Sequence, residues 1–141
     1  MQLDPVLNAD GSWPPASDIA KAVVAKQVTA LAVTEAALAK IARHNPVLNA
    51  FTDVTVGRAR STAKVIDAAI AAGKPVGPLA GVPFAVKNLF DVAGLPTRAG
   101  SKINLDRPAA VRDATLVERL EAAGAVLVGA LNMGEYAYDF T

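Results

Sequence analysis

Apolar and polar residues in the first half of the chain recur with the spacing of amphipathic helices. Helices are expected over about residues 17–26, 30–43 and 56–72. Ser17 can act as the N-cap of the first helix. The second is expected to stop at Asn45 and Pro46, because proline breaks the helical hydrogen-bond pattern. Residues 49–54 predict a short strand or extended segment, so this half should be mainly helical.

The second half of the chain contains short continuous apolar runs, which are typical of buried strands. One run, residues 82–86, follows the turn-like residues 77–81 and ends at Lys87, and a second occupies residues 125–129. Between the two runs, Asp113 is expected to cap a helix with one apolar face. Strand, connection, helix and strand make a parallel crossover unit, so this half indicates an α/β fold.

One further helix is expected after the second apolar run. Asn132 is followed three residues later by Glu135, which is the spacing of an N-terminal capping pair. A helix is therefore expected to begin at this point.

Composition narrows the class of protein. The 141 residues fit about one domain, and a net charge of +1 argues against a protein that binds nucleic acid by neutralising phosphates. No run approaches the roughly 18 apolar residues of a membrane span, and the residues after Met1 lack the pattern of a signal peptide. We therefore expect a cytoplasmic protein with no membrane or nucleic-acid partner.

The residue types present also limit the chemistry. Cysteine is absent, which excludes disulfides, thiolate catalysis and zinc sites built on sulfur. The single histidine, His44, is expected to interact with carbonyl groups at a helix end rather than with a metal, because no second histidine can share a metal.

Lys87 is the one unusual titratable residue. If the apolar run enters a buried sheet, it carries the ammonium group with it, and burial favours the neutral amine, which is a base. The alternative is a lysine at the exposed end of a strand, and lysines lie mostly at surfaces. Spacing alone favours the second interpretation, and a lone base makes no mechanism.

Other candidates for catalysis have simpler interpretations. Ser101 follows Ala99 and Gly100, and it is better explained by a turn than as a nucleophile. Asp91 and Asp113 could form a carboxylate pair, but Asp113 is better explained as a helix cap. The glycines near the second apolar run have the wrong spacing for a phosphate-binding loop.

A series of segments resembles the amidase signature family. Residues 77–90, which contain Lys87, resemble the lysine segment of that family. Further matching segments follow in order and approximate spacing over about residues 17–141: Asn45-Pro46, Asn49-Ala50-Phe51, Thr97 to Ser101, Asp113-Ala114, Leu120 to Ala125, and Asn132 to Tyr136. Each match is weak, but the series is specific. It implies N-terminal helices followed by the first strands and helices of the family's mixed sheet, which is sandwiched by helices.

The resemblance implies a serine–serine–lysine triad that hydrolyses a carbon–nitrogen amide bond. The family's lysine is a neutral base acting on a bridging serine held by a cis peptide bond, and that serine relays the proton of the nucleophilic serine. Lys87 matches the lysine, whereas Ser101 matches a different position. Both catalytic serines and the oxyanion hole belong to a segment beyond Thr141. No metal or organic cofactor is implied.

Finer features suggest which branch of the family is closest. The segment Lys102–Asn104 and the pattern Gly-x-Leu-Asn-Met at residues 129–133 look most like bacterial hydrolases of small ureides and biuret-like compounds. Amidotransferase A subunits are similar in the same segments. The chain departs from the family at Gly134, where aspartate is frequent, at Asp139, where glycine is common, and near Leu131, where a lysine is missing before Asn132. These departures concern contacts on the substrate side.

We therefore expect the N-terminal portion of an amidase. Residues 1–16 are an irregular lead-in, residues 17–75 a helical region, and residues 76–141 the start of the α/β core. The expected partners are a chain or segment carrying the catalytic serines and a small amide substrate. A homodimer or a small helical partner subunit is also possible, as in relatives. The alternative is a non-catalytic fold fragment or interaction module, and alone the chain should be inactive.

Overall fold

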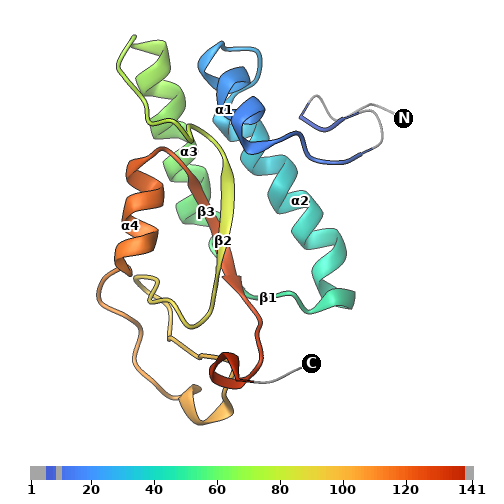
Figure 1. Cartoon of the computed structure of the whole chain (residues 1–141), viewed down its shortest axis with the longest axis vertical. Helices are drawn as coiled ribbons and strands as arrows, with labels where there is room; N and C mark the ends of the chain where they lie inside the picture. Colours follow the sequence, from blue (N-terminus) through green and yellow to red (C-terminus); the bar gives the residue numbers. More distant parts are fainter. Residues whose placement is uncertain (1–5, 9–10, 139–141) are drawn as a thin grey trace.

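The computed structural model describes residues 6–8 and 11–138, which form four α-helices and three strands (Figure 1). In chain order these are α1 (Ala16–Val24), α2 (Ala30–Leu48), β1 (Phe51–Val54), α3 (Val56–Ala71), β2 (Pro83–Lys87), α4 (Thr115–Ala122) and β3 (Val126–Leu131). Two short 3-10 turns, η1 (Lys102–Asn104) and η2 (Glu135–Ala137), lie after β2 and β3. The expected α/β fold class is confirmed.

The three strands form one mixed sheet in the order β1-β3-β2. β2 and β3 run parallel, with Pro83 opposite Val126 and Lys87 opposite Leu131, so the predicted crossover through α4 is confirmed. β1 pairs antiparallel with β3, and it lies within residues 49–54, so the short strand predicted there is confirmed. The central position of β3 explains why it reads as a continuous apolar run, since helices cover both of its faces.

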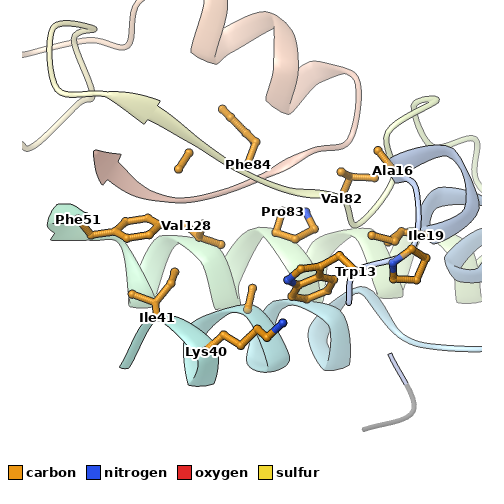
Figure 2. Close-up of a pocket in the computed structure, with 13 residues that line it drawn as sticks. Trp13, Ala16, Ile19, Lys40, Ile41, Phe51, Val82, Pro83, Phe84 and Val128 are labelled. Atoms are coloured by element: carbon orange, nitrogen blue, oxygen red, sulfur yellow. The ribbon is translucent and has the colours of Figure 1, made fainter. Parts of the chain in front are cut away.

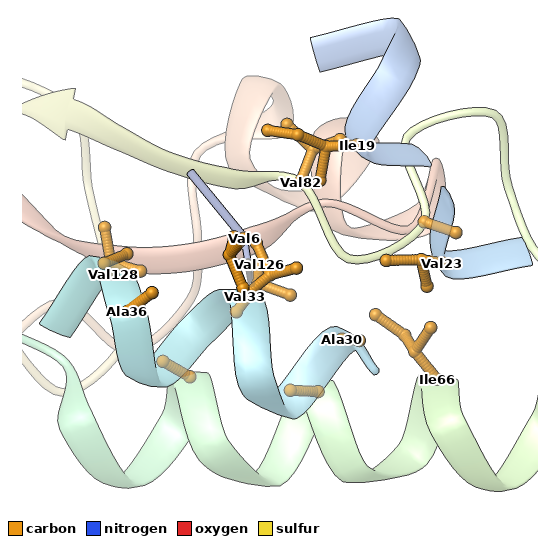
Figure 3. Close-up of a cluster of buried hydrophobic side chains, with 14 of the residues drawn as sticks. Val6, Ile19, Val23, Ala30, Val33, Ala36, Ile66, Val82, Val126 and Val128 are labelled. Carbon is orange, nitrogen blue, oxygen red and sulfur yellow. The ribbon is translucent and has the colours of Figure 1, made fainter. Parts of the chain in front are cut away.

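Alternating side chains of β3 divide the core into two layers. Val126 and Val128 pack with α1, α2 and α3 on one face, where small residues such as Ala30, at 0% exposure, allow close packing (Figure 3). Leu127 points to the other face and packs with Val117 of α4. This period of two places α1–α3 and α4 on opposite sides of the sheet (Figure 1).

Helix α2 runs past its predicted stop. It continues through Pro46 to Leu48, so the expected end at Asn45 and Pro46 is wrong. A proline in the last turn removes only one backbone hydrogen bond, and the helix ends instead at Asn49, whose φ of 50° is left-handed. The Asn45 side chain donates to the Phe51 carbonyl at 3.1 Å and accepts from the Phe51 amide at 2.7 Å, which directs the chain into β1.

Helix α1 also begins differently from the prediction. Its N-cap residue is Pro15, and Ser17 lies inside the first turn, where its hydroxyl donates to the Asp18 carboxylate at 3.4 Å. The predicted cap at Ser17 is therefore wrong. Proline suits this position because its fixed φ and missing N–H match the start of a helix.

Arg58 links helix α3 to helix α4 and to the residue Asp113 before it by hydrogen bonds. Arg58 of α3 donates to both oxygens of Asp113, at 2.9 and 2.6 Å, and to both oxygens of Glu121 in α4, at 3.1 and 2.6 Å. Asp113 also accepts from the Ala93 amide at 2.8 Å. Asp113 is therefore not the cap of α4, where Ala114 holds that position. The hydrogen bonds from Arg58 lower the pKa of Asp113, and the two carboxylates raise the pKa of Arg58.

Gly129 lies where β1 crosses closest to β3. A Cβ atom there would sit 2.4 Å from the Asp53 carbonyl oxygen and 2.8 Å from Cδ1 of Phe51. Gly129→Ala is therefore expected to lower the free energy of unfolding by about 3 kcal/mol, as overpacking does. Urea denaturation measures this loss. Gly57→Ala is the control, because no atom lies within 4 Å of its Cβ position in α3. Equal effects of the two substitutions would contradict the close-contact explanation.

Candidate active site

The parallel strands β2 and β3 end side by side, at Lys87 and Leu131. The connection from β2 to α4 and the segment after β3 meet at this end of the sheet, at the bottom of Figure 1. Ligands in open α/β sheets bind outside the carboxyl ends of parallel strands. The candidate site is therefore built from the residues that gather here.

Lys87 is the last residue of β2, and its side chain is exposed. No hydrogen bond or ion pair joins its ammonium group to any of residues 6–8 and 11–138. The exposed strand end, which spacing alone favoured, is confirmed, and the buried alternative is wrong among the described residues, because Val86 points into the core while Lys87 points outward at the strand end. Lys87 is thus held by a rigid strand and left free to engage a group that is not part of the described residues.

Asn88 follows Lys87 and is almost completely buried, at 3% exposure. Its backbone amide donates to the Leu131 carbonyl at 2.9 Å, and its backbone carbonyl accepts from the Ala99 amide at 3.0 Å. Its side-chain Oδ1 accepts from the Gly100 amide at 3.0 Å, and its Nδ2 donates to Thr52 Oγ1 at 3.4 Å. The sequence analysis missed Asn88, because nothing local marks an amide as buried.

Ser101 is held in a turn, as the sequence predicted. It is 4% exposed, and its hydroxyl donates to Glu135 Oε1 at 2.5 Å while accepting from the Ile103 amide at 3.4 Å. A hydroxyl held in this way caps the turn η1 and is not free to act as a nucleophile.

The predicted capping pair of Asn132 and Glu135 is wrong. Glu135 binds Ser101, and Asn132 donates to the Asn49 carbonyl at 3.1 Å and accepts from the amide of the next residue at 2.9 Å. Only the short turn η2 follows, with Gly134 as its N-cap residue. The partners that draw these two side chains away are distant in sequence, so spacing could not reveal them. Asp139, the other departure noted in this region, lies outside the described residues.

The loop after β2 and the segment after β3 are fastened to each other. Asn104, at 2% exposure, donates to the Arg98 carbonyl at 2.8 Å and to the Tyr136 hydroxyl at 3.0 Å. The Tyr136 amide donates to the Ala99 carbonyl at 2.8 Å. These contacts make one connected polar network beside the end of β2.

A small cavity of about 130 Å³ lies beside this network. Its lining includes Thr52, Asn88, Arg98, Ser101, Lys102 and Asn132. Arg98 Nη2 lies 3.3 Å from Asp53 Oδ1, so the charge of the guanidinium is already balanced. The exposed ammonium group of Lys102 adds a positive charge to the lining, whereas the Asn88 amide and the Ser101 hydroxyl already have partners within the fold.

A second cavity, of about 410 Å³, lies between α2 and β2 and is lined mainly by apolar side chains (Figure 2). Its one charged residue is Lys40, which donates to the Gly11 carbonyl at 2.8 Å and lies 5.7 Å from the ring centre of Trp13. With its ammonium occupied in this way, the groove offers no group for proton transfer. The candidate chemistry therefore belongs to the end of β2.

The remaining candidates do not form a site among the described residues. Asp91 accepts from the Thr97 hydroxyl and Asp113 binds Arg58, so the two carboxylates are not paired. His44 is exposed in α2, and the described part of the chain holds no group of three or more residues able to bind a metal. None of the described helices is long and apolar enough to cross a membrane.

Helices on both faces of a mixed sheet define an α/β protein, and its candidate site lies where the parallel strands end. A family model described as Amidase matches residues 32–141, and the chain belongs to the amidase signature family. The resemblance seen in the sequence is confirmed.

Individual relatives are similar over most of this chain. It is 52% identical over 124 residues to the AtzE component of the 1-carboxybiuret hydrolase of Pseudomonas sp. strain ADP, and the match covers 88% of this chain and 27% of the relative. It is 50% identical to the glutamyl-tRNA(Gln) amidotransferase A-subunit of Anaeromyxobacter dehalogenans, over 82% of this chain and 23% of the relative.

Solved structures agree with this assignment. A bacterial aryl acylamidase of the amidase signature family superposes with a TM-score of 0.81 at 31% identity, covering 88% of this chain and 26% of that one. The chain thus spans about a quarter of the length of its relatives.

Proposed function

We propose that this chain supplies the lysine base of an amidase that cleaves the carbon–nitrogen bond of a small amide or ureide. The observation that carries the proposal is the position of Lys87, which is exposed and unpaired among the described residues at the carboxyl end of β2. The next residue, Asn88, lines a small cavity together with Thr52 and Asn132. The site therefore presents a base and hydrogen-bonding groups at one edge.

In the proposed reaction, the neutral amine of Lys87 accepts a proton from a bridging serine. That serine accepts the proton of a second serine, whose oxygen attacks the amide carbon. The proton then passes to the leaving nitrogen as the carbon–nitrogen bond breaks and an acyl-enzyme forms. Water hydrolyses the acyl-enzyme and restores both serines.

Both serines are proposed to lie outside this chain, in a further segment or a second polypeptide. Lysine must lose its proton to act as a base, and burial disfavours its charged form. The same segment would therefore serve twice, by supplying the nucleophile and by covering the exposed Lys87 side chain.

A composite enzyme tests the proposal directly. This chain replaces the 124 matched residues of the Pseudomonas 1-carboxybiuret hydrolase AtzE. We expect the composite enzyme to consume 1-carboxybiuret, as measured by chromatography, while the 141-residue chain alone does not. A composite enzyme that melts cooperatively but consumes no substrate would contradict the proposal.

A second candidate is an amidotransferase A-type subunit, which the 50% identity to the Anaeromyxobacter protein favours. Glutamine-dependent ammonia release by a second composite enzyme, in which this chain replaces the 115 matched residues of the Anaeromyxobacter A-subunit, would support it. A non-catalytic interaction module remains the alternative from another class, and a stable monomer without a partner would favour it. Intact-mass analysis of native material tests for a second polypeptide, such as another copy of the chain or a small helical partner. We also propose that the protein is located in the cytoplasm.

A further inference from the structure

We propose that Asn88 is a positioning residue, whose buried side chain sets the direction in which Lys87 leaves the sheet and holds the loop over residues 97–101 beside it. The inference rests on the proposed function, because it concerns the alignment of the proposed base. Its structural part, the tie between Asn88 and the loop, can be measured separately.

The hydrogen bonds determine how the Asn88 amide is oriented. Gly100 offers an N–H, so the atom facing it at 3.0 Å must be the acceptor Oδ1. The opposite atom, Nδ2, then faces Thr52 Oγ1, which donates its own hydrogen to the Ala130 carbonyl at 3.3 Å. Every group in this series has a consistent role as donor or acceptor.

Thr52 reaches Asn88 because β1 is irregular at this point. Phe51 pairs with Leu131 and Asp53 pairs with Ala130, so Thr52 is the extra residue of a β-bulge. Bulges redirect side chains and are frequent next to functional sites. Asn88 therefore connects the ends of all three strands, through Thr52 of β1, the Leu131 carbonyl of β3, and Lys87 of β2.

The loop that Asn88 holds has a strained backbone. Ala99 has a φ of 49°, which is unfavourable for a residue with a Cβ atom, and Gly100 has a φ of 69°. A Cβ at Gly100 would lie 2.6 Å from the Met133 carbonyl oxygen. Two successive amides, of Ala99 and Gly100, donate to Asn88, and this convergence holds the loop against its strain.

The loop in turn positions part of the lining of the 130 Å³ cavity. It carries Arg98, which reaches Asp53, and Ser101, which holds Glu135. Lys87 immediately precedes Asn88. Loss of the Asn88 side-chain hydrogen bonds would therefore let both the backbone at Lys87 and the residues that line the cavity move. Groups that orient the ligands of a metal change affinity or activity by about 10–100-fold when they are lost, and we expect a similar loss for a group that orients a base.

Three variants test the proposal. Asn88→Leu keeps the size of the side chain and removes its two hydrogen bonds, from the Gly100 amide and to Thr52 Oγ1. Asn88→Asp keeps the oxygen that accepts from the Gly100 amide. Asn45→Leu is the matched control, because Asn45 makes a similar double amide bridge to Phe51, outside the candidate site. Hydrogen exchange of the Gly100 amide is measured in the 141-residue chain, and turnover in the composite enzyme.

We expect Asn88→Leu to speed exchange of the Gly100 amide about tenfold, the effect of losing one hydrogen bond of ordinary strength. In the composite enzyme, kcat should fall about 10–100-fold with little change in KM. Asn88→Asp should restore both exchange protection and most of kcat. Asn45→Leu should lower the melting temperature without lowering kcat, as a purely structural role predicts.

Full kcat in Asn88→Leu, or the same loss of kcat in Asn45→Leu, would overturn the positioning role. So would an Asn88→Asp variant that protects Gly100 but stays as inactive as Asn88→Leu. If the composite enzyme with Asn88 intact is inactive, the proposed function fails and the positioning role fails with it. Unchanged Gly100 exchange in Asn88→Leu would overturn the tie itself, whatever the turnover.

Discussion

Lys87→Ala is expected to lower kcat/KM of the composite enzyme by about 10⁴-fold, the upper range for loss of a general base. The free energy of unfolding should change by less than about 0.5 kcal/mol, because the Lys87 side chain is exposed and has no partner among the described residues. Turnover of 1-carboxybiuret and urea denaturation of the same preparations measure the two effects.

Lys87→Arg separates a base from a positive charge. Arginine keeps the charge but is not deprotonated in proteins, so this variant should be as inactive as Lys87→Ala. If charge alone mattered, Lys87→Arg would keep much of the activity. Lys74→Ala is the control for loss of an exposed lysine and should retain turnover. Retained turnover in Lys87→Ala would refute the base assignment.

The strands and their parallel pairing were predictable because burial leaves a local mark. Residues 82–86 and 125–129 are continuously apolar, as parallel strands covered by other elements must be. The helix between them was recognisable from its apolar face, and the two strands therefore had to be joined by a crossover. The exposure of Lys87 was also the interpretation that spacing favoured, because a lysine that ends an apolar run usually lies at a surface.

The errors at helix ends had two causes, a partner distant in sequence and the exact place of a residue within the last turn. Asp113 has the residue type of a cap, but Arg58 binds it from 55 positions away. Pro46 has the residue type of a helix stop, but its place in the last turn made the lost hydrogen bond tolerable. Local propensity proposes such roles, and tertiary contacts decide between them.

In the candidate site, too, one residue could be recognised from the sequence and another could not. Lys87 could be chosen from the sequence because a lysine after an apolar run is unusual, and the family resemblance then singled it out. Asn88 could not be chosen, because its burial requires the loop at residues 97–101 to fold back on the strand end. Groups that support a site are visible only when the loop is in place.

Arg58→Met is expected to lower the free energy of unfolding by about 3 kcal/mol at pH 7, because it leaves two partly buried carboxylates without a cation. The side chains of Arg58, Asp113 and Glu121 are only 24%, 16% and 21% exposed. Methionine keeps most of the apolar stem, so the loss reports the guanidinium. Arg60→Met is the matched control on the same helix. Its pair with Glu35 is 49% and 44% exposed, and a much smaller loss is expected.

The effect of Arg58 should also depend on pH. The folded-state pKa of Asp113 lies below its unfolded value, so its contribution is complete above the unfolded value of about 3.9 and is lost as the pH falls through the folded value. Without Arg58 the two carboxylates repel each other, and protonation relieves that repulsion. The difference in unfolding free energy between the natural chain and Arg58→Met should therefore shrink from pH 7 to pH 3 in urea titrations. A difference that stays constant over this range would contradict the explanation by charge, because the ion pairs weaken as Asp113 is protonated.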